Sequence, residues 1–236
     1  HPHADPERMA VTGLSGGGWQ TIILSSLDTR VRLAVPVAGH SGILHRLEHR
    51  SSIGDLEQVP CDLVSIADYT QLTAMMVPRP TLLIYNQRDN CCFVSGDVKP
   101  NIVDPVIPFF TQAGAEDRVA YHENTDPGTH NYDLDNRQQL YRFLSKHFLG
   151  KEDPTLTEIE SADEVLSDEQ LQVPLPADNA TFHSLAADAA RNLPRVPARS
   201  TPRLRRGELR EVLRIPSTRA RLVPSSVAPR MGFYRY

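Results

Sequence analysis

A serine flanked by glycines lies near the start of the chain, between two apolar segments. Gly13-Leu14-Ser15-Gly16-Gly17-Gly18 contains the spacing Gly-x-Ser-x-Gly. Residues 8–14 are typical of a short buried strand and residues 17–28 of an apolar helix, so Ser15 is expected on a sharp strand-to-helix turn. Such a turn strains the serine backbone and projects its hydroxyl beyond the sheet edge. The pattern therefore predicts a nucleophile for acyl transfer.

The residues around Ser15 are suited to that role. A Cβ at Gly13 or Gly17 is expected to collide with the neighbouring strand or with the turn itself. The next helix directs the positive end of its dipole toward the serine, and the backbone N–H of Gly16 is expected to donate to an oxyanion. Trp19, one turn further on, is expected to pack between helix and sheet. The alternative is a glycine-rich turn whose serine has no chemical role.

A serine nucleophile needs a general base, and the base needs a carboxylate that orients it. In this strand–turn–helix arrangement the chain order is serine, acid, histidine. Asp89 follows a strand expected at 81–85, and His130 follows a strand expected at 118–122. We therefore expect Ser15, Asp89 and His130 to form a catalytic triad that requires no metal or organic cofactor.

Other side chains fit these roles less well. Two further aspartates lie farther along the connection that carries Asp89, and a third precedes a Pro-Gly turn. One histidine is expected inside a strand and another on the last helix before residue 150. These competitors are Asp97, Asp104 and Asp126 for the acid, and His122 and His147 for the base.

Metal and redox chemistry have less support. His45 and His49 have the i, i+4 spacing of zinc ligands on a helix, but no Glu follows His45 in an H-E-x-x-H pattern. We interpret these two histidines, with His40, as solvated or substrate-rim side chains. The three cysteines form neither a disulfide scaffold nor a zinc cassette. Cys91 and Cys92 are adjacent and are interpreted as thiols that pack under the Asp89 loop, since a bond between neighbours strains the backbone; the third cysteine is Cys61.

Strands alternate with helices over the first 150 residues, which predicts βαβ units and a parallel sheet. The fold class is α/β, with about four parallel strands and flanking helices. The Asp133–Phe148 segment is the clearest amphipathic helix and ends at Gly150. The other expected elements are a strand at 31–37, a loop with short helical pieces at 40–60, and helices at 67–77 and at 102–113, the last interrupted by Pro105 and Pro108.

The charge distribution changes at about residue 150. Residues 151–190 hold ten acidic side chains and one Lys, and residues 191–236 hold twelve Arg and two Glu. We expect a domain boundary there, followed by an acidic and then an Arg- and Pro-rich extension with one short helix at 178–193. The net charge of −4 argues against a uniform nucleic-acid-binding protein, and no apolar run reaches the ~18 residues of a membrane-spanning helix.

Three motifs together resemble the α/β-hydrolase superfamily, and within it acetyl xylan esterases, dienelactone hydrolases and prolyl-oligopeptidase-like enzymes. The resemblance covers about residues 5–149. It implies a serine hydrolase acting on a small-molecule or carbohydrate ester, such as an acetyl ester, with Ser15 as nucleophile, His130 as base and Asp89 as the orienting acid. A serine peptidase shares this triad and stays open as an alternative. The motifs are Gly13-x-Ser15-x-Gly17-Gly18, Asn-Gln-Arg-Asp-Asn-Cys-Cys-Phe at 86–93 and Asp-Pro-Gly-Thr-His-Asn-Tyr at 126–132.

In that superfamily further strands precede the nucleophile turn. This chain opens with His1-Pro2-His3 and reaches the turn by residue 15. We therefore expect the upstream strands and a second oxyanion donor to lie outside this sequence, and the isolated chain to be weakly active. The alternative is an inactive fragment whose Arg-rich end binds anionic polymers. Neither the compartment nor the oligomeric state is indicated.

Overall fold

A computed structural model describes most of the chain. It contains two compact units, His1–Val165 and Leu166–Tyr236, and each is described by itself. The described residues are 4–49, 52–55, 58–59, 62–194, 201–213, 221–223 and 233–235.

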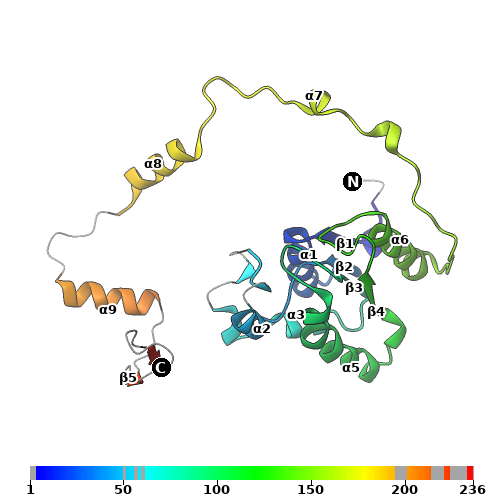
Figure 1. The fold of residues 1–236 in the computed structure, drawn as a ribbon, viewed down its shortest axis with the longest axis horizontal. Coiled ribbons are helices and arrows are strands. Elements are labelled where there is room, and N and C mark those ends of the chain that lie inside the picture. Colours follow the sequence, from blue (N-terminus) through cyan, green and yellow to red (C-terminus); the bar gives the residue numbers. More distant parts are fainter. Residues whose placement is uncertain are drawn as a thin grey trace. The chain divides into compact units, whose positions relative to one another are not determined.

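A parallel sheet forms the centre of the first unit (Figure 1). Its strand order is β1-β2-β3-β4, and every neighbouring pair is parallel. The carboxyl ends of the four strands therefore meet at one edge of the sheet. The strands are β1 (Ala10–Leu14), β2 (Leu33–Val37), β3 (Thr81–Asn86) and β4 (Val119–Asn124).

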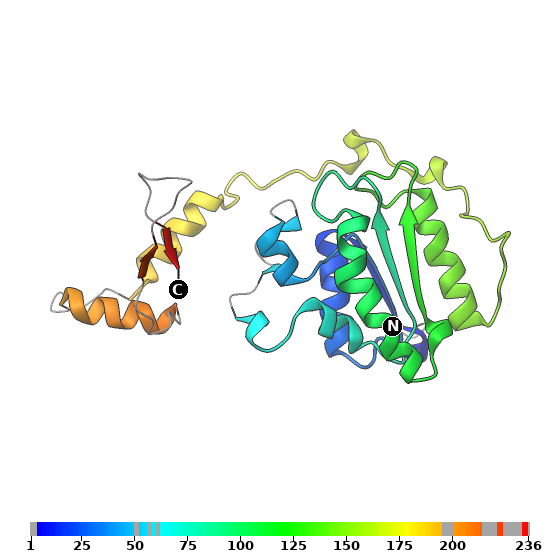
Figure 2. The same ribbon diagram turned by 60° about the horizontal axis from the view of Figure 1, so that its bottom comes forward.

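Helices cover both faces of this sheet (Figure 2). On one face, side chains from α1, α3 and α5 pack with Ala34, Leu83 and Tyr85 in the larger apolar core. On the other face, α6 packs against the alternate side chains of β2 and β3, among them Val35 and Ile84. The helices are α1 (Gly16–Leu27), α2 (Ile43–Glu48), α3 (Tyr69–Ala74), α4 (Ser95–Val98), α5 (Asp104–Gln112) and α6 (Leu134–Leu149).

The predicted α/β class with about four parallel strands is confirmed. One helix differs from expectation, because α5 runs unbroken from Asp104 to Gln112 through both prolines. Pro105 lies in the first turn, where a backbone N–H needs no helical acceptor. Pro108 removes only the bond to Asp104, the first residue of the helix. The two prolines therefore leave the rest of the helical ladder intact.

The segment after α6 folds back along that helix. Gly150 ends α6 with a φ of 64°, in the left-handed region that favours glycine. Glu158 then accepts hydrogen bonds from Arg137, at 2.6 and 2.8 Å, and from the hydroxyl of Tyr141, at 2.8 Å. This return contact belongs to the first unit. The domain boundary near residue 150 stays a prediction.

The second unit holds short elements with mostly exposed side chains. The helix expected at 178–193 is present as α8, whereas α9 was not expected. Its sequence signal is Thr201-Pro202, because Thr201 caps the first turn and proline is favoured at the first helical position. None of the described helices is both long and apolar enough to span a membrane. The elements are α7 (Asp168–Leu171), α8 (Phe182–Asn192), α9 (Pro202–Val212), β5 (Arg221–Val223) and β6 (Phe233–Arg235).

Candidate active site

Ser15 lies on the turn that joins β1 to α1. Its backbone has φ 58° and ψ −118°, a strained conformation for a residue with a Cβ. The turn is held on both sides, since Ser15 N donates to Val37 O at 2.9 Å and Trp19 N donates to Ser15 O at 2.9 Å. Gly16 is the first residue of α1, where helical N–H groups have no acceptor within the helix. The predicted strand–turn–helix geometry is confirmed.

Close backbone approach explains three of the glycines near the turn. A Cβ at Gly13 would lie 2.6 Å from the carbonyl carbon of Gly17, as expected. The expectation at Gly17 is wrong, because a Cβ there would meet nothing within 4 Å. The tight position is Gly18, where a Cβ would lie 2.6 Å from Val37 O, and Gly39 faces Gly18 in turn. Helix α1 therefore packs closely against the end of β2, with Gly18 and Gly39 at the point of contact.

Asp89 and His130 form a direct pair beyond the ends of β3 and β4. The distance from His130 Nδ1 to Asp89 Oδ2 is 2.8 Å. The Asp89 side chain is fully buried, and that of His130 is 16% exposed. The other carboxylate oxygen, Oδ1, accepts the backbone N–H groups of Cys91 at 2.9 Å and Cys92 at 3.0 Å. Two residues 41 positions apart are thus brought together as the sequence predicts.

These contacts keep Asp89 ionised. Burial raises the pKa of Asp89, but the hydrogen bonds from His130, from the N–H groups of Cys92 and Cys91 and from Asn86 outweigh it and lower the pKa to about 2. An ionised carboxylate only accepts hydrogen bonds, so Nδ1 of His130 must be the donor. In an uncharged imidazole the other nitrogen, Nε2, then has a free lone pair and is available to accept a proton.

A cluster of four buried asparagines holds the two loops. Asn86 ends β3 and donates to Asp89 Oδ2 at 3.2 Å. Asn131, next to His130, donates to Asn124 Oδ1 at 3.0 Å, and Asn136 donates to Asn86 Oδ1 at 3.1 Å. These asparagines were not expected to have a role at the site. The sequence signal was an Asn as the last residue of each of the two strands, with a third directly after His130.

The main chains of the two loops are also tied together. Arg88 N donates to Gly128 O at 2.7 Å, and the Arg88 guanidinium donates to the carbonyls of Thr125 and Pro127 at 3.1 and 2.8 Å. His130 N donates to Asn90 Oδ1 at 2.9 Å. Residues on both sides of Asp89 therefore fix the loop that carries His130.

Ser15 lies at the same sheet edge as this pair, two strands away from Asp89. Strands in a sheet are about 4.8 Å apart, so β1 and β3 are separated by about 10 Å. The His130 loop reaches β1, since Tyr132 Oη lies 2.5 Å from Thr12 Oγ1. Among the described residues, Ser15 Oγ and His130 Nε2 each lack a hydrogen-bond partner. The structure brings Asp89 and His130 into contact and places Ser15 on their side of the sheet.

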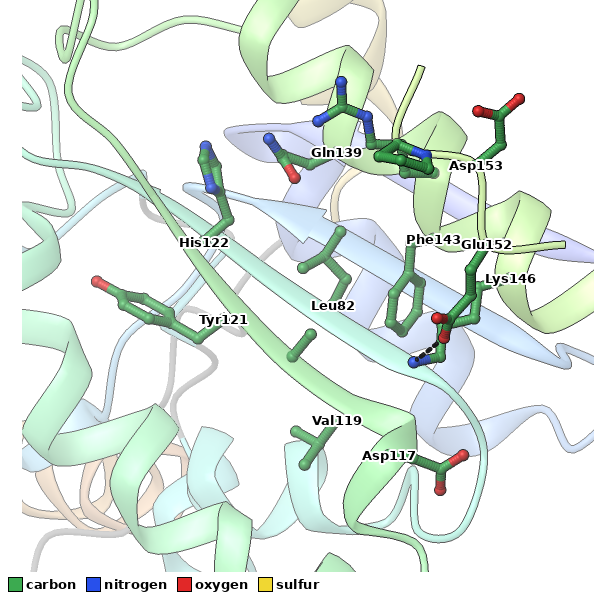
Figure 3. A pocket seen from close by; sticks show the side chains of 13 residues that line it. Leu82, Asp117, Val119, Tyr121, His122, Gln139, Phe143, Lys146, Glu152 and Asp153 are labelled. Atoms are coloured by element: carbon green, nitrogen blue, oxygen red, sulfur yellow. Dashed lines mark ion pairs between the residues drawn. The ribbon is translucent and has the colours of Figure 1, made fainter. Parts of the chain in front are cut away.

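Three of the competing residues contact other side chains. His122 Nε2 lies 2.7 Å from Asp135 Oδ2, and His122 lines a pocket of about 690 Å³ between β4 and α6 (Figure 3). That lining includes none of Ser15, Asp89 and His130. Asp104 forms an ion pair with Lys99, and His147 lies in α6 with its ring against that of Phe143. Asp97 lies in the short helix α4.

His40 differs from the expectation of a solvated or rim side chain, because it is fully buried. It lies three residues after the end of β2 and is surrounded by Thr73, Tyr69 and Tyr85, with its Nε2 3.1 Å from Thr73 Oγ1. Burial, aided by the nearby Arg46, lowers the pKa of His40 to about 3. His40 is therefore an uncharged core residue at neutral pH.

The structure also shows the other histidines, the tryptophan and the cysteines that the sequence singled out. The rings of His45 and His49 stack with centroids 4.1 Å apart. In the described part of the chain, no group of three or more His, Cys, Asp or Glu side chains could hold a metal ion.

Trp19 packs against the apolar core, as expected, and donates from Nε1 to Tyr69 Oη at 2.7 Å. Cys91 is exposed and Cys92 buried, both as free thiols, and Cys61 lies outside the described residues.

Comparison with known proteins adds a fold assignment. No protein-family model and no curated protein sequence matches this chain. A solved methylesterase structure aligns over 66% of this chain and 34% of its own, with 23% identity and a TM-score of 0.51. A glucuronoyl esterase from Sporotrichum thermophile aligns over 66% and 48%, with 14% identity and a TM-score of 0.50. The aligned region thus spans a third to a half of those proteins. The first unit of this chain has part of the α/β-hydrolase fold.

Proposed function

We propose that the protein containing this chain is a serine hydrolase that cleaves carboxylic esters. The observation that carries the proposal is the buried Asp89–His130 pair, held at the same sheet edge as a serine on a strained turn. The two similar structures are both named as esterases, which supports an ester as the substrate.

In the proposed mechanism His130 acts as a general base. Its Nε2 takes the proton of the Ser15 hydroxyl as Oγ attacks the ester carbonyl carbon. Asp89 remains ionised, fixes the Nδ1–H tautomer and stabilises the imidazolium that forms. The Gly16 N–H donates to the oxyanion of the tetrahedral intermediate, and α1 adds the positive end of its dipole. His130 then returns the proton to the leaving alcohol.

Water completes the reaction by the same route. His130 Nε2 removes a proton from water, which attacks the acyl-Ser15 ester. The second tetrahedral intermediate expels Ser15 Oγ, which recovers its proton from the imidazolium. One ester and one water yield one acid and one alcohol, and the site requires no further reactant.

We further propose a carbohydrate ester as the substrate class. The support is that one of the similar structures is a glucuronoyl esterase, together with the resemblance of the sequence motifs to acetyl xylan esterases. Acetylated sugars, methyl uronates, aryl esters and a peptide amide form a panel that separates the candidates. Turnover of the amide in preference to all esters would indicate a peptidase.

The test compares the unaltered chain with its Ser15→Ala variant on this panel. Removing the nucleophile of a serine triad lowers turnover by about 10⁶-fold in a well-studied case, so ester hydrolysis should fall to a small residual rate. Trp19→Phe, on the same helix, serves as a matched control that leaves the serine in place. Ester hydrolysis by the unaltered chain that persists at the same rate in Ser15→Ala would exclude the proposal.

A further inference from the structure

Two adjacent cysteines lie directly after Asp89 in the loop that follows β3. Cys91 is exposed, whereas Cys92 is 9% exposed. Their Sγ atoms are 2.8 Å apart, and a disulfide bond measures about 2.05 Å. The two sulfurs therefore need only a short further approach to bond. Within the described residues these are the only cysteines, so neither has another sulfur as an alternative partner there.

The same two residues hold the carboxylate of the candidate site. The backbone N–H groups of Cys91 and Cys92 donate to Asp89 Oδ1 at 2.9 and 3.0 Å. The peptide bond between the two cysteines carries the second of these N–H groups. A change in the geometry of that peptide would therefore alter the hydrogen bonds that Asp89 Oδ1 accepts.

We propose that Cys91 and Cys92 are a reversible oxidation site, at which a disulfide between them withdraws backbone hydrogen bonds from Asp89. The Cα atoms of neighbouring residues are 3.80 Å apart across a trans peptide, below the usual 4.4–6.8 Å range for a disulfide. The bond thus closes a small ring through the Cys91–Cys92 peptide, and it can close only if that peptide and the backbone angles beside it change. The oxidation site stands on the sulfur geometry alone, and its effect on activity rests on the proposed function.

The oxidant is a low-molecular-weight disulfide such as oxidised glutathione. The exposed thiolate of Cys91 attacks one glutathione sulfur, forms a mixed disulfide and releases one glutathione thiolate. Cys92 then loses its proton and attacks Sγ of Cys91, and the second glutathione thiolate leaves. The two thiols give up two electrons and two protons, and the glutathione disulfide becomes two thiols.

The surroundings of the two thiols assign the order of these steps. Burial, together with the neighbouring Cys91, raises the pKa of Cys92 to about 12, so Cys92 is protonated at neutral pH. Cys91 is reached first because it is exposed. The buried thiol then acts as the resolving group in a reaction that is effectively intramolecular.

The direct test is a thiol map of the chain in glutathione buffers of increasing oxidised fraction. Free thiols are blocked with N-ethylmaleimide, and the mass of the peptide that contains both cysteines is measured by mass spectrometry. The expected result is a peptide that lacks two hydrogens, takes no maleimide and regains both thiols in dithiothreitol. Cys61→Ser should behave in the same way. Two maleimides on this peptide in the most oxidising buffer, or a stable glutathione adduct on Cys91, would overturn the proposal.

A second measurement tests the link to Asp89 independently of catalysis. Loss of the N–H donors should raise the pKa of Asp89, so the oxidised chain should unfold at a higher pH on acid titration than the reduced chain. Ester hydrolysis should fall by about tenfold or more, less than the ~10⁴-fold loss when a triad aspartate is replaced. Cys91→Ser should show the same acid transition and the same activity in both buffers. A disulfide that changes neither the acid transition nor the rate of ester hydrolysis would refute the proposed effect on Asp89. Absence of ester hydrolysis in every buffer would count against the proposed function alone.

Discussion

The hydroxyl of Tyr132 lies 2.5 Å from Oγ1 of Thr12, a residue 120 positions earlier in the chain. Thr12 is in β1, three residues before Ser15, and Tyr132 is two residues after His130. Thr12 Oγ1 also donates to Val35 O of β2 at 2.8 Å, so Tyr132 Oη is the donor in the contact with Thr12. This contact fixes the histidine loop against β1, the strand that ends one residue before Ser15.

Tyr132→Phe should therefore loosen the site without unfolding it. The variant removes one hydrogen bond, which lowers the free energy of unfolding by about 1 kcal/mol. A 1 Å displacement of a catalytic group costs up to about 10²-fold, so kcat should fall by about 10- to 100-fold with KM little changed. Denaturant unfolding and ester kinetics measure the two effects.

Tyr141→Phe is the matched control for that variant. It also removes a tyrosine hydroxyl that makes a hydrogen bond, in this case to Glu158 on the segment that follows α6. It should change stability by a similar amount or less and leave kcat unaltered. Equal losses of kcat in both variants would show that Tyr132 has no particular role at the site.

Asp89→Asn should retain the fold and lose nearly all activity. The amide no longer fixes the Nδ1–H tautomer of His130, and the corresponding change in a known triad lowers kcat by about 10⁴-fold. Circular dichroism confirms the fold, and a sensitive fluorogenic ester measures the residual rate. Asp97→Asn is the control, because Asp97 lies in α4 of the same connection. A loss below tenfold for Asp89→Asn would contradict the assignment.

Asn86→Ala should affect both stability and activity. Asn86 is fully buried, donates to Asp89 Oδ2 and accepts from Asn136 Nδ2, so its removal leaves buried polar groups short of partners. The expected loss in the free energy of unfolding is about 1–3 kcal/mol. Asn86→Asp tests the charge instead: a second carboxylate beside Asp89 should raise the pKa of Asp89 and bring acid inactivation to a higher pH.

Asp89 also predicts a pH dependence of stability. Its pKa is about 2 in the folded chain against 3.8 for a free side chain, so its contribution is present above pH 3.8 and is lost as the pH falls toward 2. That difference corresponds to about 2 kcal/mol. The gap in unfolding free energy between the unaltered chain and Asp89→Asn should be constant above about pH 4 and shrink below it. A gap that is unchanged at pH 2 would show that Asp89 is not stabilised as predicted.

The sequence predicts the fold and the candidate triad because both depend on local patterns. Alternating apolar runs specify the parallel sheet, and the strand–turn–helix context specifies Ser15. The placement of Asp89 and His130 follows from the rule that parallel strands end at one edge. Gly17 was predicted wrongly because contact between α1 and β2 depends on which helical residue faces Val37, and this turned out to be Gly18.

Features that depend on tertiary contacts were not predictable in this way. Nothing in the sequence next to His40 predicts that Tyr69 and Tyr85 pack around its ring. The four asparagines look like ordinary loop and turn residues until β3, β4 and α6 bring them together. The approach of the two cysteine sulfurs depends on backbone angles that Asp89 itself helps to fix.

Labelling with a fluorophosphonate tests the central claim most directly, because the reagent bonds to a serine only when a nearby base activates it. The label should map to the peptide that contains Ser15, disappear in Ser15→Ala and be strongly slowed in His130→Ala. The same serine left unlabelled under conditions that modify a known serine hydrolase, or equal labelling of His130→Ala and the unaltered chain, would contradict the account.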